Sequence, residues 1–409
     1  MLRSMFTSIG ALTLHQTYMD VVANNLANVN THGFKGSRVT FLDQISEMVA
    51  AGAGPTQALG GINPTQVGLG VRLGGTTTNF TQGAMQSTGR VSDMAIQGDG
   101  FFIYANGNDR FYSRDGALEM DADGVLVNGA TGMRILGWQA QTVSGSTGVI
   151  DTGLPLSQIN IPVNSTLARA TTNATLRGNL DSTEPIGGTF TATVGVYDSL
   201  GVLHPVTVTY THTAANTWTW AASAGSPAAG VGGGTATFNA QGQYVSGTGT
   251  ITIPGSGGAA ATTATLDMSN LTQLATGSDV ALSNQDGLAA GSLTGFSVIS
   301  NTGEIFGLYS NGLQERVGQI AMANFINPAG LEHAGQNLFR LGLNSGEAQV
   351  GTANTGGRGT VVSGYLEASN VDMAQEFTNM ILAQRGFQAS SRVITTSDEM
   401  LQELVNLKR

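Results

Sequence analysis

The side chains that could carry catalysis or hold a metal are few, and they form no recognised motif. The five histidines are scattered, without the spacing of a zinc site such as H-E-x-x-H: His15, His32, His204, His212 and His333. His204 and His212 could share a β-hairpin with Asp198, so these three residues are the best candidates for a metal site or an acid–base pair. Because strand and turn positions alone explain all three residues, we expect no catalytic site and no bound metal.

Two further stretches resemble ligand-binding loops without completing them. Residues 121–124 match the start of a calcium-binding loop, but Gly132 stands where that loop requires a glutamate, so we expect a turn. Residues 33–37 lack the Gly-Lys-Ser/Thr of a phosphate-binding loop. The chain has no G-x-S-x-G nucleophile motif and no cysteine. We therefore expect no cofactor, and a hydrolase is the least favoured class of function.

The composition favours a protein whose surface is covered by copies of itself. Only 11% of the 409 residues are charged, and lysine occurs only as Lys35 and Lys408. A surface with so few charges is poorly protected against self-association. The net charge of -10 argues against a nucleic-acid partner, because binding to phosphates needs clustered Lys and Arg. The 41% share of hydrophobic residues argues against a disordered chain.

The sequence contains no segment that predicts membrane insertion. No apolar run approaches the roughly 18 residues that a membrane-spanning helix needs. Residues 1–7 mix polar side chains into the stretch where a secretory signal requires an apolar core. If the protein leaves the cell, we expect export without a cleaved signal peptide.

Near the N-terminus, residues at alternating gaps of three and four predict a helix with a heptad stripe. The stripe contains one polar interruption, Gln16, and consists of Leu2, Met5, Ile9, Leu12, Gln16, Met19, Ala23 and Leu26. The helix should end at residues 28–33, Asn-Val-Asn-Thr-His-Gly, because asparagine and glycine tolerate the backbone of a helix end. We assign Met5, Ile9, Leu12, Met19 and Leu26 to self-assembly.

The C-terminus predicts a longer helix of the same kind, about 35 residues and roughly 50 Å long. Asn370 is its expected N-cap, and Lys408 and Arg409 lie at its end, where the helix dipole favours cations. We assign its apolar stripe to self-assembly as well: Met373, Phe377, Met380, Phe387, Ile394, Leu401 and Val405.

A second row of this helix is polar, with Gln384, Ser391 and Asp398 in succession. A lone two-stranded coiled coil with such a row would be weak. We therefore expect the helix to need more than one neighbour, or to have one side in water. The alternative is an ordinary amphipathic helix lying on its own domain.

The middle of the chain predicts nested all-β domains, so the fold class is multidomain α+β. Short alternating runs rich in Thr and Gly are separated by turn signals, as in barrels or sandwiches. Shifts in composition predict three parts. These are a terminal helical domain with a linker (residues 1–70 and 360–409), a discontinuous β domain (residues 71–142 and 285–359), and an inserted outer β domain (residues 143–284).

Two stretches resemble the signatures of the flagellar axial proteins, the rod and hook subunits. Residues 23–35, ANNLANVNTHGFK, resemble the N-terminal signature, and its motif residues are Asn24, Asn25, Leu26, Asn28, Thr31, Gly33 and Phe34. Residues 363–374, SGYLEASNVDMA, resemble the C-terminal signature, which includes Asn370. Residues 196–205 and 303–312 are more similar to hook subunits than to rod subunits, as is the long insertion.

The resemblance implies a hook subunit whose terminal helices line an inner tube around an export channel, with β domains outside. It also implies a homo-polymer that meets rod subunits, the hook cap, hook–filament junction proteins and the export apparatus at an extracellular location. Such a tube would act as a bendable joint that passes torque from rod to filament. The alternatives are a distal rod subunit and, in another class, a secreted β-rich adhesin.

Three expectations follow for the parts. A stripe with a polar interruption is not stably helical alone, so residues 1–70 and 360–409 should be frayed in a dilute monomer. Residues 24–41 should link the first helix to the β domains, either as a plain linker or as an ordered contact between subunits. The outer domain has six acidic and two basic residues from Val143 to Asn284, so it should form contacts that slide during bending.

Overall fold

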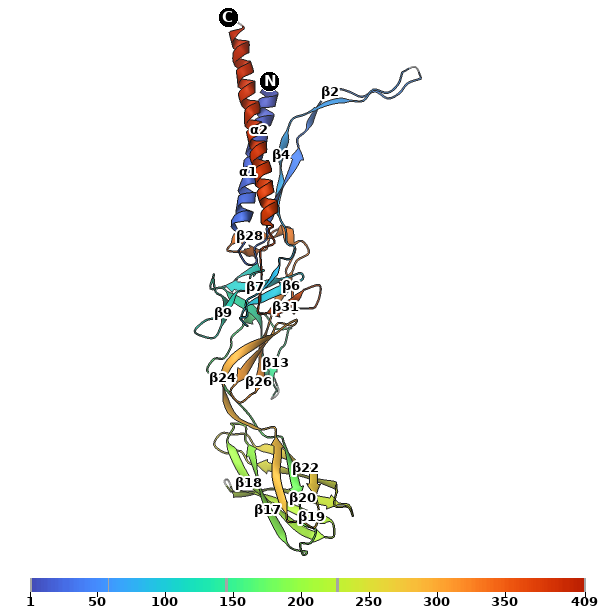
Figure 1. Cartoon of the computed structure of the whole chain (residues 1–409), viewed down its shortest axis with the longest axis vertical. Helices are drawn as coiled ribbons and strands as arrows, with labels where there is room; N and C mark the ends of the chain where they lie inside the picture. Colours follow the sequence, from blue (N-terminus) through green and yellow to red (C-terminus); the bar gives the residue numbers. More distant parts are fainter. Residues whose placement is uncertain (1, 58, 144–145, 226–227, 408–409) are drawn as a thin grey trace. The chain divides into compact units, whose positions relative to one another are not determined.

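Both ends of the chain form long α-helices in the computed structural model, which describes residues 2–57, 59–143, 146–225 and 228–407. Helix α1 spans Leu2–Ala27 and helix α2 spans Met373–Asn406 (Figure 1). The end of α1 confirms the predicted helix stop at residues 28–33. The chain is therefore helical at both ends and β-rich between them, as the predicted fold class requires.

The predicted N-cap of the second helix is wrong. Asp372 caps α2, and its carboxylate accepts hydrogen bonds from the backbone N–H groups of Ala374 at 2.8 Å and Gln375 at 3.1 Å. Asn370 lies two residues earlier than the cap position of a helix that begins at Met373. Its side chain instead bonds the segment that follows α1. The predicted cations Lys408 and Arg409 lie outside the described residues.

A two-stranded ribbon follows α1 where the sequence predicted only a linker. Strand β1 (Ser37–Asp43) pairs antiparallel with β4 (Val71–Thr78), and β2 (Ser46–Ala50) pairs with β3 (Thr65–Gly68). We call the part between Gln44 and Gly70 the finger (Figure 1). Glycines and alanines interrupt the alternation of apolar and polar residues in this stretch. Hydrophobic periodicity therefore did not predict its strands.

The strands of the first β domain surround an aromatic core. Phe101, Tyr112, Phe325 and Phe339 are buried, and the rings of Tyr112 and Phe325 meet edge to face, 4.8 Å apart. Strands β11, β7, β8, β29 and β28 are neighbours in that order. The strands are β5 (Met85–Ser87), β6 (Met94–Gln97), β7 (Phe101–Asn106), β8 (Asp109–Ser113), β9 (Leu118–Met120), β10 (Leu126–Asn128), β11 (Arg134–Gln139), β12 (Gln141–Val143), β13 (Ser146–Val149), β14 (Ser157–Gln158), β26 (Gln314–Ile320), β27 (Met322–Asn324), β28 (Glu332–Gly335), β29 (Leu338–Arg340), β30 (Gln349–Gly351), β31 (Thr360–Ser363) and β32 (Tyr365–Glu367), with a 3-10 turn η1 (Pro328–Gly330).

The inserted part forms an eight-stranded sheet in the order β17-β18-β19-β20-β21-β22-β16-β23. Since β17 also contacts β23, the sheet curls into a barrel. Its side chains alternate between the core and solvent, as along β18, and Trp218 and Tyr210 are fully buried. The strands of this sheet are β16 (Asn173–Asn179), β17 (Thr189–Tyr197), β18 (Leu203–Ala214), β19 (Thr217–Gly225), β20 (Ala228–Phe238), β21 (Tyr244–Ile253), β22 (Thr262–Thr272) and β23 (Asp279–Gln285). Outside this sheet, β15 (Thr166–Arg169), β24 (Leu288–Ile299) and β25 (Glu304–Tyr309) pair in the order β15-β24-β25-β26.

The chain divides into two compact units. The first holds both helices, the finger and the first β domain, and the second holds the barrel: Met1–Ile161, Phe296–Phe306 and Arg316–Arg409, against Pro162–Gly295 and Gly307–Glu315. The second unit begins and ends later along the chain than the predicted outer domain, residues 143–284. The three-part division predicted from composition stays a prediction.

Candidate assembly surface on the terminal helices

The two terminal helices form an antiparallel pair within the first unit. At one end, Asn25 of α1 donates a hydrogen bond to Glu376 of α2 at 3.4 Å. In the middle, His15 of α1 faces Gly386 of α2. Figure 1 shows the helices side by side, with both chain termini at the same end of the pair. The pair thus brings together two stripes that lie more than 340 residues apart in sequence.

Small residues of α2 form the line of closest contact. Ala383 is 1% exposed and Ser397 is 2% exposed. At Gly386 an added Cβ would lie 2.4 Å from the imidazole of His15, so a larger residue there would require the His15 ring to move. The buried residues of α1 are likewise mixed in size and polarity: Ser8, Leu14, Val22 and Asn25. Small side chains let the two helix backbones approach closely, which a search for large apolar residues does not detect.

The large apolar residues of the predicted stripes lie beside this line or away from it. Half-buried positions are Met5, Leu12, Met19 and Leu26 in α1, and Met380, Phe387, Ile394 and Leu401 in α2. Ile9, Met373, Phe377 and Val405 are 45%, 46%, 49% and 68% exposed. Further exposed apolar residues of α2, absent from the predicted stripe, are Ile381, Leu382, Val393, Met400 and Leu404. The helix pair therefore leaves much apolar surface uncovered within one chain.

The finger carries a second uncovered apolar surface. Its large apolar side chains are exposed: Ile45, Met48, Val49, Leu59, Ile62, Val67 and Leu69. Its base is held to α1 by an ion pair between Arg3 and Glu47 and by a hydrogen bond from Thr7 to the Leu69 carbonyl at 3.3 Å. A two-stranded ribbon is marginally stable in water without further packing. The finger thus adds to the surface that a neighbouring molecule could bury.

The N-terminal signature residues hold the junction between α1 and the β domain. Asn25, 2% exposed, exchanges two hydrogen bonds with the backbone of Ser37, at 2.8 and 2.9 Å. Asn28 accepts a hydrogen bond from the Thr31 hydroxyl at 3.1 Å and donates to the Asn24 carbonyl at 2.9 Å. These contacts close the turn that ends the helix.

Gly33 and its neighbours continue the junction. Gly33 has φ +70°, and an added Cβ would lie 2.6 Å from the backbone nitrogen of Asp115. Phe34 is half-buried. Asn370 of the C-terminal signature accepts from the Gly36 N–H at 2.9 Å and donates to the Asn79 carbonyl at 2.8 Å. Asn370 therefore joins the C-terminal signature to the residue that follows the N-terminal signature.

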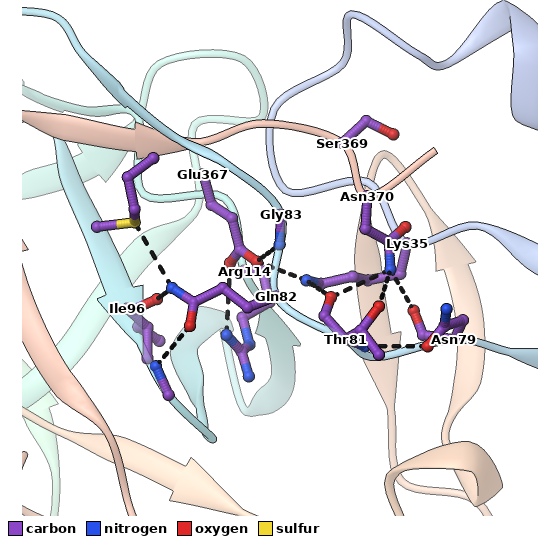
Figure 2. A network of polar contacts seen from close by, with 12 residues as sticks. Lys35, Asn79, Thr81, Gln82, Gly83, Ile96, Arg114, Glu367, Ser369 and Asn370 are labelled. Atoms are coloured by element: carbon purple, nitrogen blue, oxygen red, sulfur yellow. Dashed lines mark hydrogen bonds and ion pairs between the residues drawn. The ribbon is translucent and has the colours of Figure 1, made fainter. Parts of the chain in front are cut away.

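A buried carboxylate lies at the centre of the junction. Glu367 accepts from the Lys35 ammonium at 2.6 Å, from the Gly83 N–H at 2.8 Å and from Arg114 at 3.4 Å (Figure 2). The side chains of Lys35 and Glu367 are fully buried, and Arg114 also lies over the Phe101 ring. Burial lowers the pKa of Lys35, and the attraction of Glu367 offsets part of that effect. Sequence analysis did not single out this cluster, because its members lie far apart in the chain.

The candidate residues for chemistry do not form one site. Asp198 and His204 form a hydrogen-bonded pair, 2.8 Å apart, and Asp198 also accepts from the Leu200 and Val202 N–H groups, which shapes a turn. His212 points elsewhere: it bonds the Glu184 carbonyl and stacks on Trp218. Among the residues that the structure describes, no group of three His, Cys, Asp or Glu side chains could hold a metal ion.

The expected turn at residues 121–124 is present, and the Asp121 carboxylate accepts hydrogen bonds from the N–H groups of Asp123 and Val125, both at 2.9 Å.

In the described part of the chain, neither terminal helix is long and apolar enough to cross a membrane.

Sequence comparisons match nearly the whole chain to flagellar proteins. The flagellar basal body rod protein model matches residues 5–35, and the hook protein FlgE/F/G D1 domain model matches residues 95–175. The FlaE D2 domain model matches residues 160–288, and the rod FlgEFG C-terminal model matches residues 362–407.

Similar proteins include three with full-length matches. The flagellar hook protein FlgE of Borreliella burgdorferi is 38% identical, with 100% of both chains covered. FlgE of Salmonella typhimurium is 36% identical, with 98% of this chain and 99% of that protein covered. The basal-body rod protein FlgG of Bacillus subtilis is 31% identical over 100% of both chains. Among solved structures, the hook protein FlgE2 of Helicobacter pylori has a TM-score of 0.47, with 16% identity over 69% of this chain and 100% of that chain.

Replacement of the junction carboxylate should destabilise the first unit. Glu367→Gln removes the counter-charge of the buried Lys35 and the stronger of the two carboxylate attractions on Arg114, so we expect a loss of about 3–5 kcal/mol of unfolding free energy. The control Glu119→Gln breaks an exposed pair with Arg90 and should cost less than about 1 kcal/mol. Amide hydrogen exchange of β6 and β7 at increasing urea concentrations measures the loss of unfolding free energy in each variant. Equal, small losses in the two variants would contradict a stabilising role for the junction.

Proposed function

Because the chain belongs to the flagellar hook protein family, we propose that it is the structural subunit of a bacterial hook, in which its copies assemble into a tube. The observation that carries this proposal is the apolar surface that α2 and the finger leave exposed in a single chain. Apolar patches of this kind mark surfaces that a partner covers. In a homo-polymer, another copy of the same chain covers this surface.

Assembly of the subunit follows from how its surfaces are placed. Head-to-tail contact between different surfaces produces an open helical polymer when the rotation does not close. In our proposal the terminal helices form the inner wall, with the predicted stripe residues of both helices at contacts between copies. The finger extends those contacts to further neighbours. The β domains lie outside, and we propose no catalytic role for any residue.

We attribute the bendable character of the tube to the predicted outer domain, residues 143–284. Bending requires subunits on the inner and outer curve to sit at different spacings. Since residues 143–284 contain only six acidic and two basic residues, few ion pairs would have to break as neighbours slide. Torque would pass from rod to filament through such a joint.

Hook proteins associate with other flagellar components and form part of a structure that extends outside the cell. For this chain we propose rod subunits, the hook cap, hook–filament junction proteins and the export apparatus as the specific partners. We also propose that it is exported without a cleaved signal peptide.

A distal rod subunit is the second candidate, and it is not favoured. FlgG of Bacillus subtilis is 31% identical, whereas the hook proteins of Borreliella burgdorferi and Treponema pallidum are 38% and 36% identical, and the model of the D2 domain matches residues 160–288. A secreted adhesin would not account for two long terminal helices.

Charged residues on the exposed face of α2 should stop fibre growth. Ile381→Asp with Leu382→Asp places two charges where our proposal buries apolar side chains, so purified protein should form no tubes in electron micrographs. Leu343→Asp changes a fully exposed apolar residue outside the helices and the finger, and should leave tubes intact. Normal tubes from the α2 variant would count against assembly through this helix.

Removal of the barrel should change the shape of the tubes without preventing assembly. Thr172 and Asp286 lie together, with the Thr172 N–H donating to the Asp286 carboxylate at 2.8 Å. A short Gly-Ser linker can therefore replace residues 173–285. We expect tubes with altered curvature or stiffness, measured by electron microscopy. Complete loss of assembly would refute this division of roles between the units.

A further inference from the structure

One face of α2 carries four charged residues that have no ionic partner in the described residues of the chain. Arg385, Arg392, Glu399 and Glu403 are all exposed. At 3.6 residues per turn, their spacing of seven, seven and four residues places them within about 40° of one another around the helix axis. This face points away from α1, because Ala383 and Ser397 on the opposite side are the residues buried against it.

The charges on this face are sorted along the helix. The two arginines come first and the two glutamates follow, towards the C-terminus. Glu399 and Glu403 are one turn apart, so they repel each other in an isolated helix. The same glutamates line a shallow, open apolar groove formed with Met400, Leu404 and Leu407 on the surface of this helix. A basic partner with an apolar stem would relieve the repulsion and fill the groove.

A second copy of α2 has the chemistry that this face requires. Copies in a head-to-tail polymer run in the same direction. Two parallel helices in register would place like charges opposite each other. A shift of 12 to 13 residues, about 19 Å along the axis, would place the acidic pair of one copy beside the basic pair of the next. The arginine stems would then lie over the groove.

We propose that this face of α2 forms charge contacts between copies that lie side by side, in which Glu399 and Glu403 of one copy bind Arg385 and Arg392 of the next, staggered copy. The inference rests on the proposed self-assembly and adds the residues that set its axial register. Charge pairs of this kind select register and partner more than they add affinity. Repulsion between helices in register also disfavours the unstaggered aggregate.

Charge reversal on purified full-length chains tests the contact. One variant carries Arg385→Glu with Arg392→Glu, and a second carries Glu399→Arg with Glu403→Arg. Each alone should raise the critical concentration for tube growth at least about tenfold, because like charges then meet at every contact. An equal mixture of the two variants should restore growth. A single chain with all four substitutions, whose net charge stays at -10, should also grow tubes.

The controls separate this contact from a change in net charge and from misfolding. The control Arg110→Glu with Arg177→Glu changes the net charge by the same amount as the variant with Arg385→Glu and Arg392→Glu, at exposed positions outside the helices. It should grow tubes like the unaltered chain. Circular dichroism checks that every variant folds. Unimpaired growth of both reversed variants, or failure of the folded fourfold variant, would overturn the inference while leaving the proposed function intact. Absence of tubes from the unaltered chain would instead contradict the proposed function.

Discussion

Apolar side chains that a single chain cannot cover are the constraint on which the rest of this structure depends. Residues such as Phe377, Ile381 and Leu382 on α2, and Ile45 and Ile62 in the finger, remain in water when α1 and α2 are paired. The pairing itself uses the small residues Ala383, Gly386 and Ser397, so the larger ones stay available. A tube of copies resolves this constraint, because each copy then supplies the apolar partner that its neighbours lack.

The junction around Glu367 gives this assembly a fixed geometry within the first unit. Lys35 follows α1, Glu367 precedes α2, and Arg114 belongs to the β domain. The Glu367 carboxylate therefore connects the segment after α1 and the segment before α2 to the β domain. The signature asparagines Asn25 and Asn370 add hydrogen bonds to backbone groups beside it. The junction therefore couples both helices to the β domain within the first unit.

The sequence predicted those features that depend on local periodicity. Both helices and the β-rich middle were identified because large apolar residues repeat at helix or strand spacing. The contact line through Ala383 and Gly386 was missed, because small residues produce no hydrophobic signal. The finger was missed because its glycines interrupt the alternation, and Asn370 was mistaken for a cap because its partner Gly36 is distant in sequence. Contacts between distant residues leave no mark in local spacing.

Amide hydrogen exchange, compared between dilute monomer and assembled tubes, tests the central claim most directly. The account predicts rapid exchange along α1, the finger and α2 in the monomer, with the β core of the first unit already protected. On assembly, protection should appear along both helices and the finger, since helices in proteins gain most of their stability from packing. Strong protection of both helices in the dilute monomer, unchanged by assembly, would contradict the claim that neighbouring copies stabilise them.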